Sequence, residues 1–194
     1  MHRLSAPLLL FGLLSLSACG STSTGGASAT ACAAGSSTPA PSASPSAASL
    51  ELTVADLPCA GPRLTQVSDG LLNNTPNTAQ RVFANSGNTY RVEDDIIVDT
   101  SASQAHTDYQ QFADAAKKNY ASVSATSSPS GLGSDSTELA GTAPNGYSLL
   151  SIAWDEGSVL VALLFESSTG PVDQTFAEDT AHAQANLILN NGSA

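Results

Sequence analysis

The sequence is poor in basic residues, in aromatic residues and in cysteine. Its 194 residues include 6 Lys and Arg against 17 Asp and Glu, and 5% of them are aromatic. Because nucleic-acid binding needs Lys and Arg to displace counterions from phosphates, the acidic excess argues against nucleic acid as a partner. It equally disfavours electrostatic docking onto anionic lipid. With so few aromatic residues, a domain needs most of them for its core.

Long apolar runs and common catalytic motifs are also missing. The apolar stretch from Leu4 to Leu16 is too short to cross a hydrocarbon core of ~30 Å, and with the basic Arg3 before it the stretch is typical of a signal peptide. The sequence contains no Gly-x-Ser-x-Gly, P-loop, His-Glu-x-x-His or Ser-x-x-Lys motif. Gly131-Leu132-Gly133-Ser134-Asp135 fits none of these, and we interpret it as a turn before a strand. We therefore expect no enzyme and no cofactor.

What the sequence does contain is a sorting signal. Leu16-Ser17-Ala18-Cys19 ends the apolar stretch and resembles the lipobox of bacterial lipoproteins. This resemblance implies cleavage before Cys19, acylation of the Cys19 sulfur, and a lipid anchor on the extracytoplasmic side of the cell membrane. Two or more acyl chains are enough for stable anchoring. The alternative is an ordinary secretory signal with a chance cysteine.

The two other cysteines, Cys32 and Cys59, have neither Cys-x-x-Cys nor metal-ligand spacing, so zinc and redox catalysis are not expected. An oxidising compartment permits a disulfide between them. Two free thiols are the alternative.

Composition divides the chain into three parts. Residues 1–18 are the signal peptide, and residues 19–50 are the lipidated cysteine followed by a tether. The tether consists almost entirely of Gly, Ser, Thr, Ala and Pro, and cannot bury enough apolar surface to fold. As a flexible coil it would span roughly 30 Å. Residues 51–194 are enough for one domain.

Patterning within residues 51–194 predicts an α+β domain, with an antiparallel sheet of about five strands and two helices packed on one face. Residues 61–78 are expected to form a loop. The helices are expected from a capping box at Ser101 to about residue 120, and from Asp173 to Asn190. The strands are expected at 52–58, 80–84, 90–99 and 136–140, and in a hairpin over 147–167 whose continuously apolar part, 159–165, is typical of a strand covered on both faces.

Polar candidates within this domain are few. Glu93, Asp94, Asp95 and Asp99 could hold Ca²⁺, but they lack the ligand spacing of a calcium loop, and alternate members of a strand point to opposite faces. We therefore interpret them as a solvated strand entry. His106 and His182 are expected on exposed helix faces, although they could meet across the fold. The larger aromatic residues could line a pocket but are expected in the core: Trp154, Tyr147, Tyr109 and Phe112.

The architecture is also similar to the small extracytoplasmic domains of actinobacterial lipoproteins and of some receptor-kinase sensors. The similarity rests on the turn at 132–135, the hairpin at 147–165 and the terminal helix at 173–189, and it carries over no functional residue. The sequence thus favours an envelope lipoprotein that binds or senses a ligand or a protein partner without catalysis. The alternative is an envelope hydrolase whose site is assembled from residues distant in the sequence.

Overall fold

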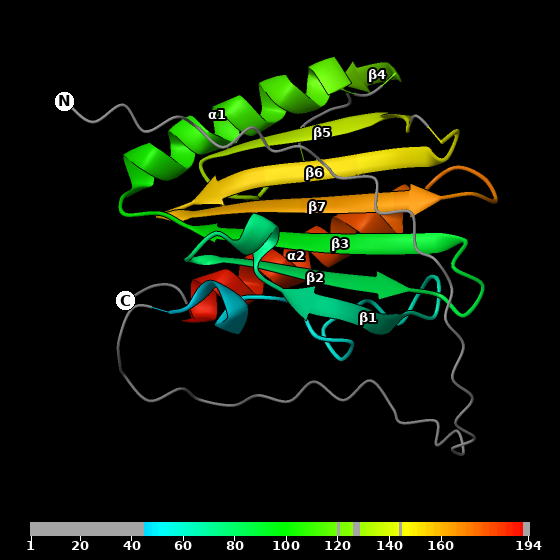
Figure 1. The fold of residues 1–194 in the computed structure, drawn as a ribbon, viewed down its shortest axis with the longest axis horizontal. Helices are drawn as coiled ribbons and strands as arrows, with labels where there is room; N and C mark the ends of the chain where they lie inside the picture. Colours follow the sequence, from blue (N-terminus) through cyan, green and yellow to red (C-terminus); the bar gives the residue numbers. More distant parts are fainter. Residues whose placement is uncertain (1–44, 120, 126–128, 144, 192–194) are drawn as a thin grey trace.

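A single antiparallel sheet forms the centre of the molecule (Figure 1). The computed structural model describes residues 45–119, 121–125, 129–143 and 145–191. The sheet has seven strands in the order β1-β2-β3-β7-β6-β5-β4. Their bounds are β1 Thr65–Gly70, β2 Thr78–Ala84, β3 Tyr90–Val98, β4 Ala121–Ala125, β5 Asp135–Thr142, β6 Ser148–Glu156 and β7 Val159–Ser167.

The hairpin of β6 and β7 occupies the middle of the sheet, as its apolar sequence predicted. Trp154 is opposite Val161 and Ile152 is opposite Leu163, and all four side chains are fully buried. Because side chains alternate along a strand, Leu160 and Ala162 of β7 face the other side, where they are buried in a second apolar cluster. β7 is therefore covered on both faces.

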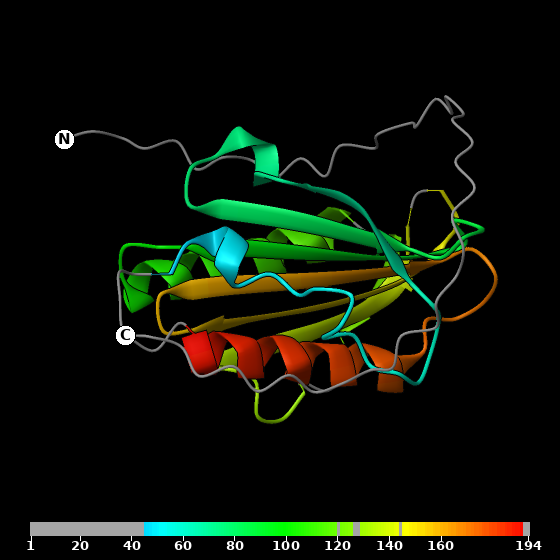
Figure 2. The same ribbon diagram turned by 90° about the horizontal axis from the view of Figure 1, so that it is seen from below.

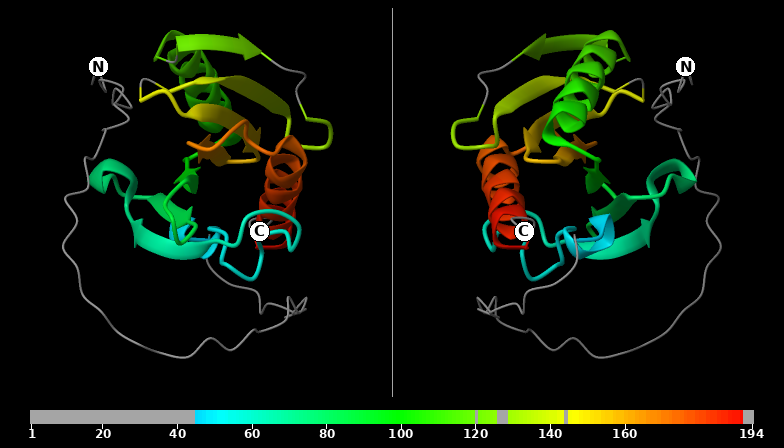
Figure 3. Two further views of the ribbon diagram at one scale, coloured as in Figure 1. Left: turned by 90° about the vertical axis from the view of Figure 1, so that its right-hand side faces the viewer. Right: turned by 90° about the vertical axis from the view of Figure 1, so that its left-hand side faces the viewer.

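Each face of the sheet is covered by one helix. α1 (Ala102–Asn119) places Tyr109, Phe112 and Ala116 against Leu160 and Ala162. On the opposite face, α2 (Gln174–Asn191) buries an apolar stripe that includes Phe176, Ala181 and Ile188. The separation is visible in Figure 2, where α2 runs along one face, and in Figure 3, where the sheet is seen end-on between the helices.

The α+β class, the antiparallel sheet and the two helices are confirmed, with two differences in detail. The sheet has seven strands instead of about five, and the helices lie on opposite faces instead of one. The second difference follows from β7, since a strand with apolar residues on both faces needs a cover on both.

Both helices begin where the sequence places a capping residue. The Oγ of Ser101 accepts a hydrogen bond from the N–H of Gln104 at 3.2 Å, and Oδ1 of Asp173 accepts one from the N–H of Phe176 at 3.1 Å. Each bond satisfies a donor that the first turn of a helix leaves free.

The prediction of a strand at residues 52–58 is wrong. A short 3-10 helix, η1 (Ala47–Ser49), is followed by an irregular stretch, and together residues 47–52 form a strap across the α2 face of the sheet. Leu50 and Leu52 are fully buried there. The side-chain amide of Gln184 on α2 donates to the carbonyl oxygen of Leu50. The folded part therefore begins before Glu51, where the composition changes.

The loop expected at residues 61–78 contains β1 and a second 3-10 helix, η2 (Leu72–Asn74). β1 is an edge strand whose six residues are all exposed, so it carries no apolar alternation that a sequence pattern could reveal. β4, at the other edge, was not expected either. No helix among the described residues is long and apolar enough to cross a membrane.

Three of the expectations fall on residues outside the described ranges: the signal peptide, the acylation of Cys19, and the tether up to residue 44. Cys59 is disulfide-bonded. Since Cys32 lies outside the described residues, the pairing of Cys32 with Cys59 stays a prediction.

Candidate functional site

The acidic run on β3 is buried, which contradicts the expectation of a solvated strand entry. The exposed fractions are 7% for Glu93, 0% for Asp94 and 5% for Asp95. As the alternation of a strand requires, Asp94 points to the α2 face while Glu93 and Asp95 point to the α1 face. The run thus supplies two separate acidic groups, one on each face of the sheet.

On the α2 face, Asp94 holds the strap of residues 47–52. Its Oδ2 accepts a hydrogen bond from the N–H of Leu52 at 2.8 Å, and Arg81 on β2 donates to the carbonyl oxygen of Leu52 at 2.7 Å. The Arg81 guanidinium also lies 3.1 Å from Glu51 and 2.8 Å from Asp69. The Arg81 guanidinium thus forms ion pairs with both Glu51 and Asp69.

Burial shifts the titration of this group. It raises the pKa of Asp94 to about 7, against the opposing effects of the Leu52 N–H and of Arg81. It also raises the pKa of Glu51 to about 8, although Arg81 again favours the charged form. A buried carboxyl is costly to ionise, and a single guanidinium does not compensate two of them.

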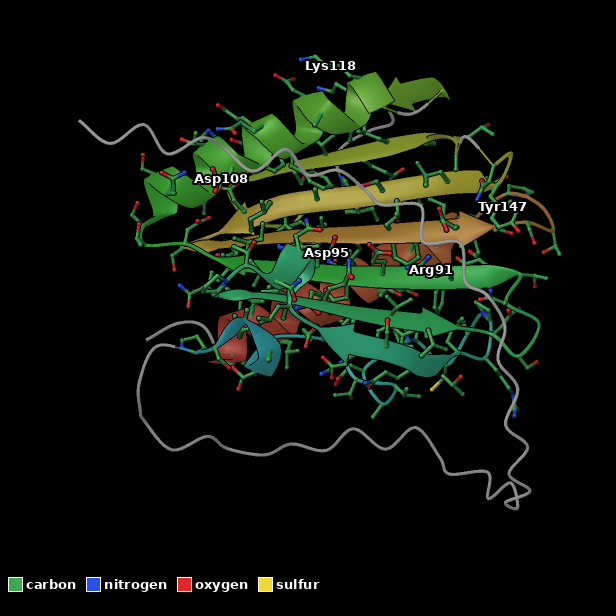
Figure 4. All side chains as sticks on the ribbon, viewed as in Figure 1. Arg91, Asp95, Asp108, Lys118 and Tyr147 are labelled. Carbon is green, nitrogen blue, oxygen red and sulfur yellow. The ribbon has the colours of Figure 1, made fainter. Side chains whose placement is uncertain are left out.

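On the α1 face, polar side chains of β2 and β3 form what we call the acidic strip: Gln80, Arg91, Glu93 and Asp95. The Gln80 amide bridges the two carboxylates, since its Nε2 donates to Glu93 at 2.8 Å and to Asp95 at 3.0 Å. Arg91 donates to the other oxygen of Glu93 at 2.8 Å. The strip extends beyond the strands that α1 covers, and Figure 4 labels Arg91 and Asp95 along β3.

The acidic strip has more negative than positive charge. Burial raises the pKa of Asp95 well above its usual range, and the neighbouring Glu93 raises it further, while Gln80 opposes the shift. Burial likewise raises the pKa of Glu93, with Arg91 lowering it and Glu166 of β7 raising it. A cation next to Asp95 would oppose this rise in its pKa, because a nearby positive charge favours the ionised carboxylate.

A small apolar hollow adjoins the strip between α1 and η2. It is lined by Asp95 together with five apolar side chains: Leu72, Ile97, Phe112, Leu160 and Ala162. Asp95 is thus a carboxylate at the wall of an otherwise hydrophobic depression. A more open groove lies on the other side of the sheet beside the loop before α2, but its carboxylate, Glu138, is held by Gln174 at 3.1 Å.

His106 does not lie on a plain exposed helix face. Its Nδ1 is 3.5 Å from Oδ2 of Asp135 and 3.4 Å from Oδ2 of Asp155. Its Nε2 is 2.9 Å from the side-chain amide of Gln110, one turn further along α1. Tyr109 lies beside this group, where its hydroxyl is 2.5 Å from that of Thr137. From the sequence, the alternative to an exposed helix face was a meeting of His106 with His182, whereas the side chains that approach Nδ1 of His106 are two aspartates.

The remaining candidates lie as their sequence context suggested. Trp154, Tyr109 and Phe112 are buried in the core, and Tyr147 is half-buried at its margin. His182 is exposed on α2. Residues 131–134 form a turn that leads into β5. At Gly133 φ is +47°, and a Cβ there would clash with the carbonyl group of Asp155, so only glycine fits.

Comparison with known proteins gives little support for a family. No protein-family model matches the sequence, and no curated protein matches it. Among solved structures, the extracellular domain of PknH from Mycobacterium tuberculosis is similar, with a TM-score of 0.45 and 13% sequence identity over 58% of this chain. The match spans 63% of that chain's length. This likeness is too distant to transfer a function.

Proposed function

We propose that this protein is a lipoprotein anchored to the cell membrane through Cys19, whose folded domain binds a ligand on the extracytoplasmic side and catalyses no reaction. The signal peptide and the lipobox support the location, and the scarcity of basic residues argues against a second, electrostatic anchor. The folded residues supply a single compact unit that the tether would hold away from the bilayer.

The binding surface that we propose is the acidic strip with its hollow, and the ligand class is a small monovalent cation such as ammonium, because the hollow's volume of about 10 Å³ admits a group the size of one water molecule. The observation that carries this proposal is the position of Asp95, a buried carboxylate in the wall of an apolar hollow. The ion would pair with Asp95, with Leu72 and Ile97 bordering it. The ring of Phe112 adds a surface that attracts cations.

The hydrogen bonds of the strip favour binding over hydrolysis. Both oxygens of Glu93 are already engaged, one by Gln80 and one by Arg91. A catalytic acid or base must reach a proton of the substrate, and a hydrolase also needs room for the bond that it cleaves. A small hollow with one carboxylate in its wall offers a place to bind a charged group.

The test is calorimetric titration of the full chain with ammonium chloride at pH 7.5, with tetramethylammonium formate as the matched anion because its own cation is too large for the hollow. We expect binding of the cation and none of the anion. Asp95→Asn should abolish it, since the amide keeps the shape and the Gln80 contact but removes the charge. Asp179→Asn, an exposed position on α2, is the matched control and should bind like the parent chain.

Two results would contradict the proposal. One is equal heats for the cation and the anion, and the other is unchanged ammonium binding by the Asp95→Asn variant. Anchoring is tested separately: the parent chain should sediment with membranes, whatever the outcome of the titration.

A further inference from the structure

The cluster of His106, Asp135 and Asp155 lies apart from the acidic strip. Packing of the apolar core does not explain why these three polar side chains meet. Asp135 and Asp155 are directly opposite each other across β5 and β6. Two like charges in directly opposed positions destabilise a sheet. Among the described residues, neither aspartate is within ion-pair distance of a Lys or Arg. Both aspartates instead approach the imidazole of His106.

Asp155 has unused capacity to bind a cation. Its side chain is 4% exposed, and its Oδ1 has no hydrogen-bond partner within the described part of the chain. A buried carboxylate oxygen without a partner is costly and calls for an explanation. Its other oxygen, Oδ2, is 3.4 Å from Nδ1 of His106. Asp155 therefore has one carboxylate oxygen beside His106 and a second oxygen without a partner.

The distances fit a shared ion better than they fit direct hydrogen bonds. Separations of 3.4 and 3.5 Å between Nδ1 and the two carboxylates are too long for a good hydrogen bond. In a tetrahedral site with metal–ligand bonds of about 2.0 Å, two ligand atoms lie about 3.3 Å apart. The three candidate ligand atoms all lie within 4.8 Å of one another, so a small rotation of the exposed Asp135 completes the set.

We propose that His106, Asp135 and Asp155 bind a divalent transition-metal ion, with Zn²⁺ as the best match. One imidazole nitrogen with two carboxylates suits Zn²⁺ or a neighbouring transition metal, whereas Ca²⁺ and Mg²⁺ prefer sites made of oxygen alone. Three protein ligands leave a fourth position for water. The side chains of His106 and Asp135 are 37% and 59% exposed, so the ion can enter from solvent.

Neighbouring residues hold the proposed ligands in place. The Gln110 amide contacts Nε2 of His106, and with its oxygen turned to the ring it would accept the Nε2 proton and leave Nδ1 free to bind the metal. Gly133 allows the turn before β5 to approach Asp155, whose carbonyl oxygen accepts a hydrogen bond from Ser134 at 2.9 Å. This close approach fixes Asp135 opposite Asp155.

The test is calorimetric titration of the full chain with Zn²⁺ alone after treatment with a chelator. We expect one Zn²⁺ per chain and no comparable binding of Ca²⁺. His106→Gln and Asp135→Asn should each lower the affinity for Zn²⁺ at least tenfold, since loss of even an outer contact of a metal ligand typically costs 10–100-fold. Both positions are partly exposed, so the variants should fold, which circular dichroism would check.

Matched controls separate this site from other metal-binding groups. His182→Gln removes an exposed histidine on α2, and Asp114→Asn removes an exposed aspartate on α1, so both should bind Zn²⁺ like the parent chain. Zinc held by cysteine would be unaffected by His106→Gln. Unchanged Zn²⁺ binding in the His106→Gln and Asp135→Asn variants, or no stoichiometric binding by the parent chain, would overturn the proposal. Neither result bears on ammonium binding at Asp95.

Discussion

The buried carboxyl of Asp94 should make the stability of this protein fall as the pH rises through neutrality. Burial raises its pKa from 3.8 to about 7. Between these two values the folded protein holds a proton that the unfolded chain has released, so each step up in pH favours unfolding. A carboxyl that gained stability from its ion pair would have the opposite pH dependence, with a lowered pKa.

The size of the effect follows from the shift. One pKa unit corresponds to about 1.4 kcal/mol. Between pH 5 and about pH 7, the folded protein keeps a proton on Asp94 that the unfolded chain has lost. Over these roughly two pH units the free energy of unfolding falls by about 3 kcal/mol. Glu51 shares Arg81 with Asp94 and has a pKa raised to about 8, so it should act in the same direction.

The assay is urea unfolding of the full chain at pH 5, 6, 7 and 8, followed by circular dichroism. Asp94→Asn should reduce the pH dependence, because the amide oxygen can still accept the Leu52 N–H but no longer titrates, while Glu51 keeps its own contribution. Asp179→Asn is the control and should keep the slope of the parent chain. A parent stability that is flat or rises from pH 5 to pH 8 would refute the reasoning, as would an unchanged slope in the Asp94→Asn variant.

Three further predictions concern packing and anchoring. Leu52→Ala should lower the free energy of unfolding by about 2–5 kcal/mol, as for other fully buried leucines, while Val54→Ala at a 46% exposed position should change it little, as urea unfolding can measure. Gly133→Ala should lower the thermal midpoint, because a Cβ there meets the carbonyl of Asp155; a midpoint equal to the parent's would contradict this. Cys19→Ala should release the protein from membranes into the soluble fraction on sedimentation, and continued binding would show that the lipobox interpretation is wrong.

The elements with strong apolar patterns were predictable. The hairpin of β6 and β7 has both the alternation and the continuous apolar run of a central sheet, and its strands pair as expected. The start of each helix was visible from Ser101 and Asp173, whose side chains make capping hydrogen bonds. These features are local, so the sequence around them is sufficient to indicate them.

The elements without such patterns were missed. The six residues of β1 are all exposed, and its strand pairing with β2 depends on backbone hydrogen bonds that no side-chain period reveals. Leu50 closes a stretch of tether-like composition, yet it is fully buried and its carbonyl oxygen accepts a hydrogen bond from Gln184, which is far away in the sequence. The helix positions could have been inferred from β7, since a strand that is apolar on both faces implies a cover on both.

The candidate site was hard to predict because it depends on strand register. Asp135 and Asp155 become neighbours only through the pairing of β5 with β6, and His106 reaches them only because Tyr109 and Phe112 seat α1 on that face. The acidic run on β3 drew attention from the sequence, but charge runs are usually solvated. Its burial could not be inferred without knowing that β3 lies inside the sheet.

The composition bears on both sites at which we propose that cations bind, Asp95 and Asp155. With 17 acidic and 6 basic residues, the chain has too few guanidinium and ammonium groups to pair every carboxylate. Arg81 is shared by Glu51 and Asp69, and Arg91 pairs with Glu93 while Asp95 relies on an amide. A buried carboxylate without a cation must either take up a proton or recruit a positive charge from outside. Recruitment from solvent requires access. Two described carboxylates that combine burial with such access are Asp95, beside its hollow, and Asp155, behind the exposed Asp135, and they are the two positions at which we propose that cations bind.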